Sequence, residues 1–385
     1  MTEHNDKKVL LCQPFGNVLN NPLTAEIIAT LVDSGYVVEC FSKKNKTVNQ
    51  VTKGLYFKED PFIWSAAKEI VREYICFQWL SNICGWIDAR RFANRNFCFV
   101  ISVDRAGVLE ATAITKKLGT VHYHLSYEIF FADETSPRYK RIERAAYKNV
   151  TAVIIQDRLR AELFCQENDV SLSKISLIPL CLRKNAASPD FAPRARDLCG
   201  IPLDKKVLIS IGSLADWSMA REIIQQVCDL PKEWVLLMNE RFGDARELEA
   251  YVESIGMTGR IYFNSSPVRD IRDIKQVLQG CSFGLAFYKP TYKSKYTGKN
   301  IKNIGLASGK LVTFLSHELP VITNIEGQAR ILIERYRAGV VVQDPAGINQ
   351  AVETSIDAKG PAVLFSTIFD YDLYETKIKK LLAIG

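Results

Sequence analysis

A run of small residues that ends in a lysine is the part of this sequence best suited to phosphate chemistry. The small residues are Gly305, Ser308 and Gly309, and Lys310 follows them. Small residues at a helix N-terminus leave backbone N–H groups and the positive end of the helix dipole open to phosphate oxygens. The segment is not a Walker loop, because Leu311 stands where that motif requires Ser or Thr. It predicts a phosphate-binding loop, with an ordinary helix start as the alternative.

Polar residues of a catalytic type follow two apolar segments in the first half of the chain. His124 ends one segment, Glu128 comes shortly after it, and Asp104 follows the other segment. An imidazole can hydrogen-bond a sugar hydroxyl, and a carboxylate can orient an acceptor or stabilise positive charge in a transition state. We therefore predict His124, Glu128 and Asp104 as catalytic residues.

Two alternatives to these catalytic roles stay open. Strand alternation places His122 and His124 on one face, where either can be a buried histidine whose hydrogen bonds are satisfied in the core. Asp104 and Arg105 can form an ion pair that has no catalytic task.

The loop after the first apolar segment holds Gly16 and Asn17, which we predict on the acceptor side of the site, with an ordinary turn as the alternative. This loop has no Gly-x-Gly-x-x-Gly fingerprint and no acidic residue at the dinucleotide spacing. A nicotinamide or flavin enzyme is therefore disfavoured.

Metal and disulfide signatures are missing from the sequence. No Asp-x-Asp follows a predicted strand, no His-Glu-x-x-His occurs, and the 10 cysteines never form a Cys-x-x-Cys pair. We predict no metal, no cofactor and free thiols in a reducing compartment.

The elements that position these residues are short apolar strands separated by helical patterns. Strands are predicted at residues 9–13, 36–41, 97–102, 120–124, 152–156 and 175–179, and again at 207–211, 234–238, 260–263, 282–286, 320–323 and 339–343. A polar, proline-containing linker at 183–196 separates the two sets. This alternation predicts an α/β protein with two Rossmann-like, doubly wound domains that face each other across a cleft.

The predicted domains are residues 1–184 and 197–365, with a C-terminal helix at 366–385 that packs back on the first domain. The length of 385 residues fits two domains, and a hydrophobic fraction of 47% supports full cores. The net charge of +7 suits anionic partners. No apolar run is long enough to span a membrane and the N-terminus is polar, so we expect a cytoplasmic protein.

The run Ser308-Gly-Lys-Leu-Val-Thr-Phe-Leu-Ser-His-Glu-Leu-Pro-Val-Ile322 resembles a segment of the GT-B glycosyltransferases, especially the retaining family-four group. Residues 153–157 and 174–179 are similar to the stretch that closes the N-terminal domain of those enzymes. Residues 207–214 are similar to the strand-Gly-x-Leu opening of their C-terminal domain. The resemblance spans nearly the whole chain.

The resemblance implies a nucleotide-sugar donor in the second domain and an acceptor in the first. Gly305 to Lys310 would face the diphosphate and donor sugar, with Gly212 and Ser213 beside them. Thr313 stands where the family usually has a ribose-binding glutamate, and a second family glutamate is missing near Gly305. Arg221, or the basic loop with Lys289, Lys293, Lys295 and Lys299, is a substitute source of positive charge, with a solvated loop as the alternative.

The implied activity is metal-independent, hexosyltransferase-like transfer of a sugar from a nucleoside diphosphate sugar to a saccharide or lipid-linked acceptor. The implied stereochemistry is retaining, and the implied setting is bacterial polysaccharide assembly. A sugar-nucleotide epimerase and a non-catalytic glycosyltransferase-like partner subunit remain alternatives. No nucleic-acid partner is predicted.

Residues 61–95 combine aromatic and basic side chains. The aromatic residues are Phe62, Trp64, Tyr74, Phe77, Trp79 and Trp86, with Arg72, Arg90, Arg91 and Arg95 nearby. Such a composition suits an interfacial helix on an anionic membrane, which predicts peripheral contact with the inner membrane face. Core packing between strands is the alternative.

Overall fold

The chain folds into two compact units. The computed structural model describes residues 7–14, 18–43, 54–184, 194–241, 244–264, 266, 268 and 270–384. Unit 1 comprises Met1–Val18, Thr24–Pro179 and Tyr374–Gly385, and unit 2 comprises Leu19–Leu23 and Leu180–Leu373. Most of the predicted linker, and both Gly16 and Asn17, lie outside the described residues.

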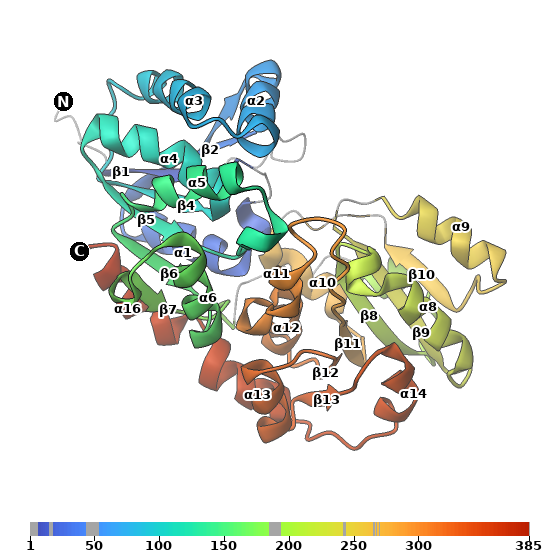
Figure 1. Cartoon of the computed structure of the whole chain (residues 1–385). Coiled ribbons are helices and arrows are strands. Elements are labelled where there is room, and N and C mark those ends of the chain that lie inside the picture. Colours follow the sequence, from blue (N-terminus) through green and yellow to red (C-terminus); the bar gives the residue numbers. More distant parts are fainter. Residues whose placement is uncertain are drawn as a thin grey trace. The chain divides into compact units, whose positions relative to one another are not determined.

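Unit 1 is built on a parallel sheet with the strand order β3-β2-β1-β4-β5-β6-β7. Its strands are β1 (Lys7–Cys12), β2 (Tyr36–Lys43), β3 (Leu55–Asp60), β4 (Phe99–Val103), β5 (Val121–Leu125), β6 (Ala152–Ile155) and β7 (Ile175–Leu177). Val9 of β1 pairs with Val38 on one side and with Phe99 on the other. The interior strands β4 and β6 are almost wholly apolar because helices cover both faces of the sheet (Figure 1).

Two helices of unit 1 begin with a side chain that caps the first turn. Ser136 caps one helix through a hydrogen bond from the Tyr139 N–H, and Asp157 caps the next through the Arg160 N–H. The helical segments are η1 (Val18–Asn20), α1 (Pro22–Asp33), α2 (Phe62–Glu69), η2 (Ile70–Ile75), α3 (Gln78–Arg91), α4 (Asp104–Leu118), η3 (Ala132–Glu134), α5 (Pro137–Tyr147), α6 (Arg158–Asn168), η4 (Leu172–Lys174) and α16 (Asp372–Leu381).

The C-terminal helix α16 reaches the edge of the first sheet. Lys377 of α16 donates a hydrogen bond to the Leu177 carbonyl of β7 at 3.0 Å. Figure 1 shows α16, in red, beside the green strand β7. The last residues of the chain therefore belong to the same compact unit as the first.

Unit 2 has a parallel sheet with the order β10-β9-β8-β11-β12-β13. Its strands are β8 (Lys206–Gly212), β9 (Trp234–Glu240), β10 (Ile261–Asn264), β11 (Phe283–Ala286), β12 (Val321–Thr323) and β13 (Gly339–Val341). The order reverses at β8, which has β9 on one side and β11 on the other. Loops that leave β8 and β11 at their carboxyl ends therefore diverge, and ligands of open parallel sheets bind at such a point.

The helical segments of unit 2 include one that packs tightly on β11. They are α7 (Ala195–Leu198), η5 (Asp216–Ser218), α8 (Ala220–Asp229), α9 (Arg246–Ser254), η6 (Ile271–Ile274), α10 (Lys275–Leu278), α11 (Lys299–Lys302), η7 (Gly305–Ala307), α12 (Gly309–Ser316), α13 (Gln328–Tyr336), η8 (Pro345–Gly347), α14 (Ile348–Ala351), α15 (Gly360–Leu364) and η9 (Phe365–Phe369). A Cβ on Gly284 of β11 would lie 2.3 Å from the Phe314 ring of α12. This close packing holds α12 against the sheet.

The predicted fold class is confirmed, with one strand added. Every strand predicted from the sequence is present, and both sheets are parallel. The sequence analysis missed β3, because Lys58, Glu59 and Asp60 give its second half a polar composition that an edge strand tolerates. Among the described residues, no helix combines the length and the apolar character needed to cross a bilayer.

Candidate functional site

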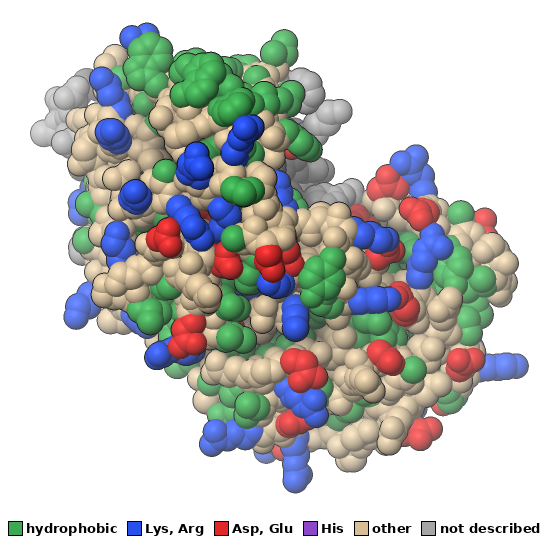
Figure 2. All heavy atoms as spheres, in the orientation of Figure 1, with side chains coloured by type: hydrophobic (Ala, Val, Ile, Leu, Met, Phe, Trp, Pro, Cys, Tyr) green, Lys and Arg blue, Asp and Glu red, His purple; other side chains and the backbone are tan. Residues whose placement is uncertain are grey.

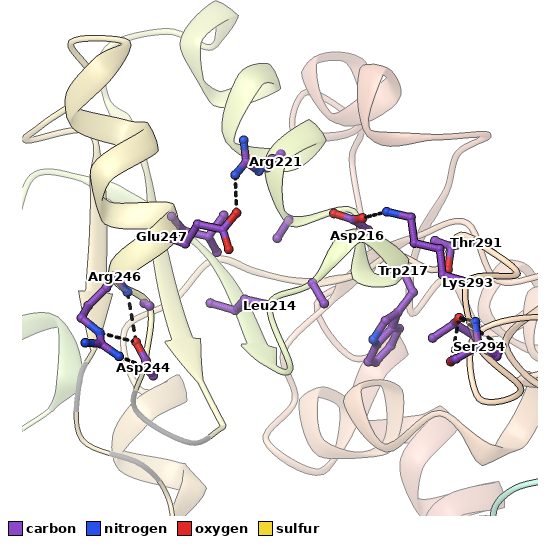
Figure 3. A pocket seen from close by; sticks show the side chains of 15 residues that line it. Leu214, Asp216, Trp217, Arg221, Asp244, Arg246, Glu247, Thr291, Lys293 and Ser294 are labelled. Carbon is purple, nitrogen blue, oxygen red and sulfur yellow. Dashed lines mark hydrogen bonds and ion pairs between the residues drawn. The ribbon is translucent and has the colours of Figure 1, made fainter. Parts of the chain in front are cut away.

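A cavity of about 940 Å³ lies at the carboxyl edge of the second sheet. It is lined by the loop after β8, by the first turns of α8 and α9, and by the loop after β11 (Figure 3). The cavity therefore sits where the strand order reverses, and two helix N-termini add positive dipole ends to it. Its position is that of a ligand site in an open parallel sheet.

The charged side chains around this cavity are already paired with one another. Figure 3 shows Lys293 extended toward Asp216, Arg221 toward Glu247, and Arg246 toward Asp244. The hydrogen bond from Lys293 lowers the pKa of Asp216, and the hydrogen bonds from Arg246 lower the pKa of Asp244 to about 2. An anion that used these cations would have to displace a carboxylate.

Lys310, the second residue of α12, lies next to the cavity residue Trp217 and differs from these paired side chains. Its side chain is buried, with 7% of the residue exposed, and its Nζ has no hydrogen-bond partner in the part of the chain that the structure describes. Burial lowers the pKa of Lys310 to about 8, so the amine is still mostly protonated at pH 7. A buried ammonium without a partner is costly, and a bound anion would remove that cost.

Two aromatic rings lie next to this ammonium. Lys310 Nζ is 5.8 Å from the ring centre of Trp217 and 5.7 Å from that of Tyr288. The two rings stack with centres 6.2 Å apart. Cation–π attraction compensates part of the lost hydration of the amine. Because Trp217 also lines the cavity, it connects Lys310 to that cavity.

The predicted donor residues Ser308 and Gly309 form the start of α12. Ser308 Oγ accepts a hydrogen bond from the Leu311 N–H at 3.1 Å and lies 2.7 Å from the Tyr288 hydroxyl. Ser308 therefore caps the helix and orients Tyr288, and its side chain is buried. A Cβ on Gly309 would meet no heavy atom within 4 Å, so open space lies beside the first residue of the helix.

Gly212 ends β8 and passes close to Lys310. Its φ of +91° is a conformation that glycine adopts freely and other residues adopt at a cost. A Cβ at this position would lie 3.6 Å from Lys310 Cε. The structure thus brings Gly212, Ser308, Gly309 and Lys310 together.

The remaining predicted donor residues are Ser213, Gly305 and Thr313, which are close to this group in the sequence. Ser213 follows Gly212 and is partly buried, and Gly305 opens η7 with a φ of +45°. Thr313 lies one turn after Lys310 on α12 and is buried. The substitute cations Lys289 and Lys293 are paired with carboxylates.

Sequence analysis missed Trp217, Tyr288 and Asn324 as site residues. Asn324, directly after β12, accepts from the Tyr288 N–H and donates to the Tyr288 carbonyl, both at 2.9 Å. It thereby fixes the loop after β11 to the end of β12. The signal that could have found it is its place, a polar residue immediately after a buried strand.

The predicted catalytic histidine lies in the core of unit 1. His124 Nδ1 is 2.8 Å from Ser102 Oγ, its Nε2 is 3.2 Å from the Tyr147 hydroxyl, and its ring stacks on Phe164. His122 Nε2 is 2.8 Å from the same Ser102 Oγ, so the two imidazoles do share one face. Burial lowers the pKa of His122 to about 3 and that of His124 well below its usual range. This geometry favours the packing role over the catalytic one.

Asp104 holds a loop in place. Its Oδ1 accepts from the N–H groups of Tyr127 and Glu128 at 2.7 and 2.9 Å, which ties the end of β4 to the loop after β5. Burial raises the pKa of Asp104 to about 6. The alternative of an Asp104–Arg105 ion pair is wrong, because Arg105 pairs with Glu73. Glu128 is partly buried beside this loop.

The cysteines and the possible metal-ligating residues do not cluster in the described part of the chain. All ten cysteines are free thiols. Among the residues that the structure describes, no three His, Cys, Asp or Glu side chains gather as a metal site would require.

Two parallel, doubly wound sheets in these strand orders, together with the similar structures below, show that the chain has the GT-B fold. The chain is similar to HepE of Anabaena in complex with UDP and glucose (15% identity, 98% of this chain and 99% of that chain, TM-score 0.70). It is also similar to sucrose-phosphate synthase of Thermosynechococcus elongatus (12% identity, 98% of both chains, TM-score 0.70). A third similar structure is WaaG, a glycosyltransferase involved in lipopolysaccharide biosynthesis (13% identity, 97% of this chain and 99% of that chain, TM-score 0.64).

No protein-family model matches the chain, and no curated protein matches it. The likeness to solved structures therefore defines its fold.

Proposed function

We propose that the chain is a glycosyltransferase that transfers a sugar from a nucleoside diphosphate sugar to a saccharide or lipid-linked acceptor. The observation that carries the proposal is the buried, unpaired ammonium of Lys310 beside the N-terminus of α12. A diphosphate is a ligand that would satisfy this ammonium and could accept from backbone N–H groups at the start of α12.

The surroundings of Lys310 support a nucleotide-sugar ligand. Open space beside Gly309 lets phosphate oxygens approach the backbone of α12. The neighbouring cavity of about 940 Å³ has the size of a cofactor or substrate site. HepE, one of the similar structures, is described with UDP and glucose bound, and that pairing fits a donor of this class.

In the proposed reaction, the bond between the sugar and the diphosphate breaks while an acceptor hydroxyl attacks the anomeric carbon, and the hydroxyl proton passes to the departing diphosphate. Negative charge grows on the leaving diphosphate, where Lys310 and the α12 N–H groups stabilise it more strongly than in the ground state. We further propose retention of configuration, no need for a divalent cation, and a role in bacterial polysaccharide assembly. NMR of the product anomer and assays in chelator test the first two of these.

The test of donor binding is a thermal-shift screen of the full chain with UDP, GDP, ADP and CMP. One nucleotide should stabilise the protein, by about 2.7 kcal/mol at a concentration of 100 Kd. Lys310→Met should lose this stabilisation. Lys302→Met is the matched control, because Lys302 is exposed on α11 and should respond like the wild type. A wild-type chain that responds to none of the four nucleotides would overturn the proposal.

A non-catalytic partner subunit is the second candidate, and Thr313 is the observation that favours it. A buried threonine offers no carboxylate to the ribose hydroxyls. Turnover separates the candidates: a transferase releases nucleoside diphosphate only with acceptor or water, and a partner subunit releases none. An epimerase would convert the donor with no acceptor and no release.

A further inference from the structure

Helices α2 and α3, with η2 between them, expose apolar side chains to solvent. The exposed large side chains of this segment are Ile63, Ile70, Tyr74, Ile75, Phe77, Trp79, Ile83 and Trp86, which we call the α2–α3 surface. Ile63 is 83% exposed and Trp79 is 61% exposed. Figure 2 shows hydrophobic side chains gathered at the top of the view, over α2 and α3 as Figure 1 places them. So dense an apolar patch marks an interaction surface.

The same segment turns its charged side chains inward. Lys68 Nζ lies 3.0 Å from a carboxylate oxygen of Asp88 and 2.7 Å from one of Glu110. Arg72 lies 2.7 Å from Glu110, and the Trp64 indole donates to Asp88 at 2.9 Å. Ordinary surface helices bury their apolar face and expose their charges. These helices do the opposite, which implies an apolar phase on their outer side.

The charges that remain at the outer side are positive. The Arg90 guanidinium lies 3.5 Å from the ring centre of Trp86, and that of Arg138 lies 4.7 Å from the ring centre of Phe77. Both arginines are exposed. Of the acidic residues in the segment 61–95, Glu69 and Glu73 are partly buried and Asp88 is buried, so no acidic side chain of this described segment is exposed.

We propose that the α2–α3 surface docks on an anionic lipid bilayer. The aliphatic and aromatic side chains enter the boundary between headgroups and acyl chains, and Arg90 and Arg138 contact lipid phosphates. Tryptophan and tyrosine favour this interface because their rings are apolar and carry one polar atom each. The proposal goes beyond the transfer reaction and does not require it.

A bilayer fits this surface better than a second copy of the chain. A two-fold dimer places the same patch on both sides of its interface. It would therefore bring together two patches that both carry Arg90 and Arg138, with no exposed carboxylate of the segment 61–95 to balance them. Like charges facing each other oppose such an interface, whereas lipid phosphates balance them.

Vesicle sedimentation of the full chain tests the docking. The wild type should sediment with phosphatidylcholine vesicles that contain phosphatidylglycerol and much less with pure phosphatidylcholine. Ile63→Ser/Ile70→Ser should bind at least about tenfold more weakly, because two apolar side chains no longer enter the lipid. The matched control is Leu159→Ser/Leu172→Ser, which changes two half-exposed leucines elsewhere on unit 1 and should bind like the wild type.

A second set of variants tests the contribution of the arginine charges to vesicle binding. Arg90→Gln/Arg138→Gln should weaken binding roughly fivefold for each charge removed. Arg158→Gln, on the exposed part of α6, should have no effect. An unchanged midpoint of thermal unfolding, measured without nucleotide, shows that each variant is folded and keeps this test independent of the proposed function.

Three results would overturn the proposal. The first is no sedimentation of the wild type with anionic vesicles, and the second is equal binding by Ile63→Ser/Ile70→Ser. The third is a concentration-dependent dimer, seen by sedimentation velocity without lipid, that this variant abolishes; that result would assign the surface to a second copy.

Discussion

The carboxyl edges of the two sheets both carry buried polar side chains, but these side chains differ in whether they have hydrogen-bond partners within the protein. In unit 1, His124 and Asp104 find all their partners inside the unit, in Ser102, Tyr147 and the loop after β5. In unit 2, the Lys310 ammonium is just as deeply placed and has no hydrogen-bond partner among the described residues. A polar residue at a strand end is thus not by itself a site, whereas a buried charge that lacks a partner indicates a ligand.

Replacing Lys310 should produce the largest functional change. Lys310→Met removes the positive charge at the leaving diphosphate, so we expect kcat/KM for transfer to fall by roughly a hundredfold to a thousandfold. The free protein should become more stable, because methionine fills the same space without a buried charge. Wild-type turnover by this variant would show that the unpaired ammonium at the edge of the second sheet does not stabilise the leaving group.

The gain in stability has a defined size and pH dependence. The pKa of Lys310 is lowered to about 8, which at about 1.4 kcal/mol per unit penalises the folded wild type by about 3 kcal/mol at pH 7. A lowered lysine pKa costs stability where the amine is charged, so the penalty fades as the pH rises from 8 toward 10.5. Denaturant unfolding of both proteins at pH 7 and pH 10 measures it.

Asp104 should show the opposite pH dependence in unit 1. Its pKa is raised to about 6, so the folded state disfavours the charged carboxylate. The stability it contributes is fully present below pH 4 and is lost as the pH rises to 6, by up to about 3 kcal/mol. Asp104→Asn keeps an oxygen for the N–H groups of Tyr127 and Glu128 but does not titrate. The difference in unfolding free energy between the two proteins should therefore change over this pH range and be constant above it.

The strands and some of the residues at the carboxyl edges could be predicted from the sequence, whereas contacts between distant segments could not. The strands were predictable because near-continuous apolar runs leave little other choice in a doubly wound protein. Lys310 was predictable from its local run of glycine and serine. Trp217 and Tyr288 were not, since they meet only when β8 and β11, far apart in the chain, become neighbours. Alternation gave the shared face of His122 and His124 but not Ser102, whose hydroxyl lies 2.8 Å from a ring nitrogen of each.

His124→Phe should affect stability and leave donor binding unchanged. Phenylalanine keeps the packing against Phe164 but leaves the Tyr147 hydroxyl without its partner in the core. We expect a loss of about 2 kcal/mol in unfolding free energy. The nucleotide-induced thermal shift should be the same as in the wild type. Loss of turnover with an unchanged unfolding free energy would instead restore His124 as a catalytic residue.

Tyr288→Phe should have the smallest effect, and it separates the contribution of the Tyr288 hydroxyl from that of the Lys310 ammonium. It removes the hydroxyl that lies 2.7 Å from Ser308 Oγ, while the ring remains beside Trp217 and Lys310. Ser308 still caps α12 through the Leu311 N–H, so stability should fall by only about 1 kcal/mol. Nucleotide affinity should fall less than in Lys310→Met, because the charge stays in place. If isothermal titration showed a larger loss of affinity in Tyr288→Phe than in Lys310→Met, the hydroxyl rather than the ammonium would be the group that holds the ligand.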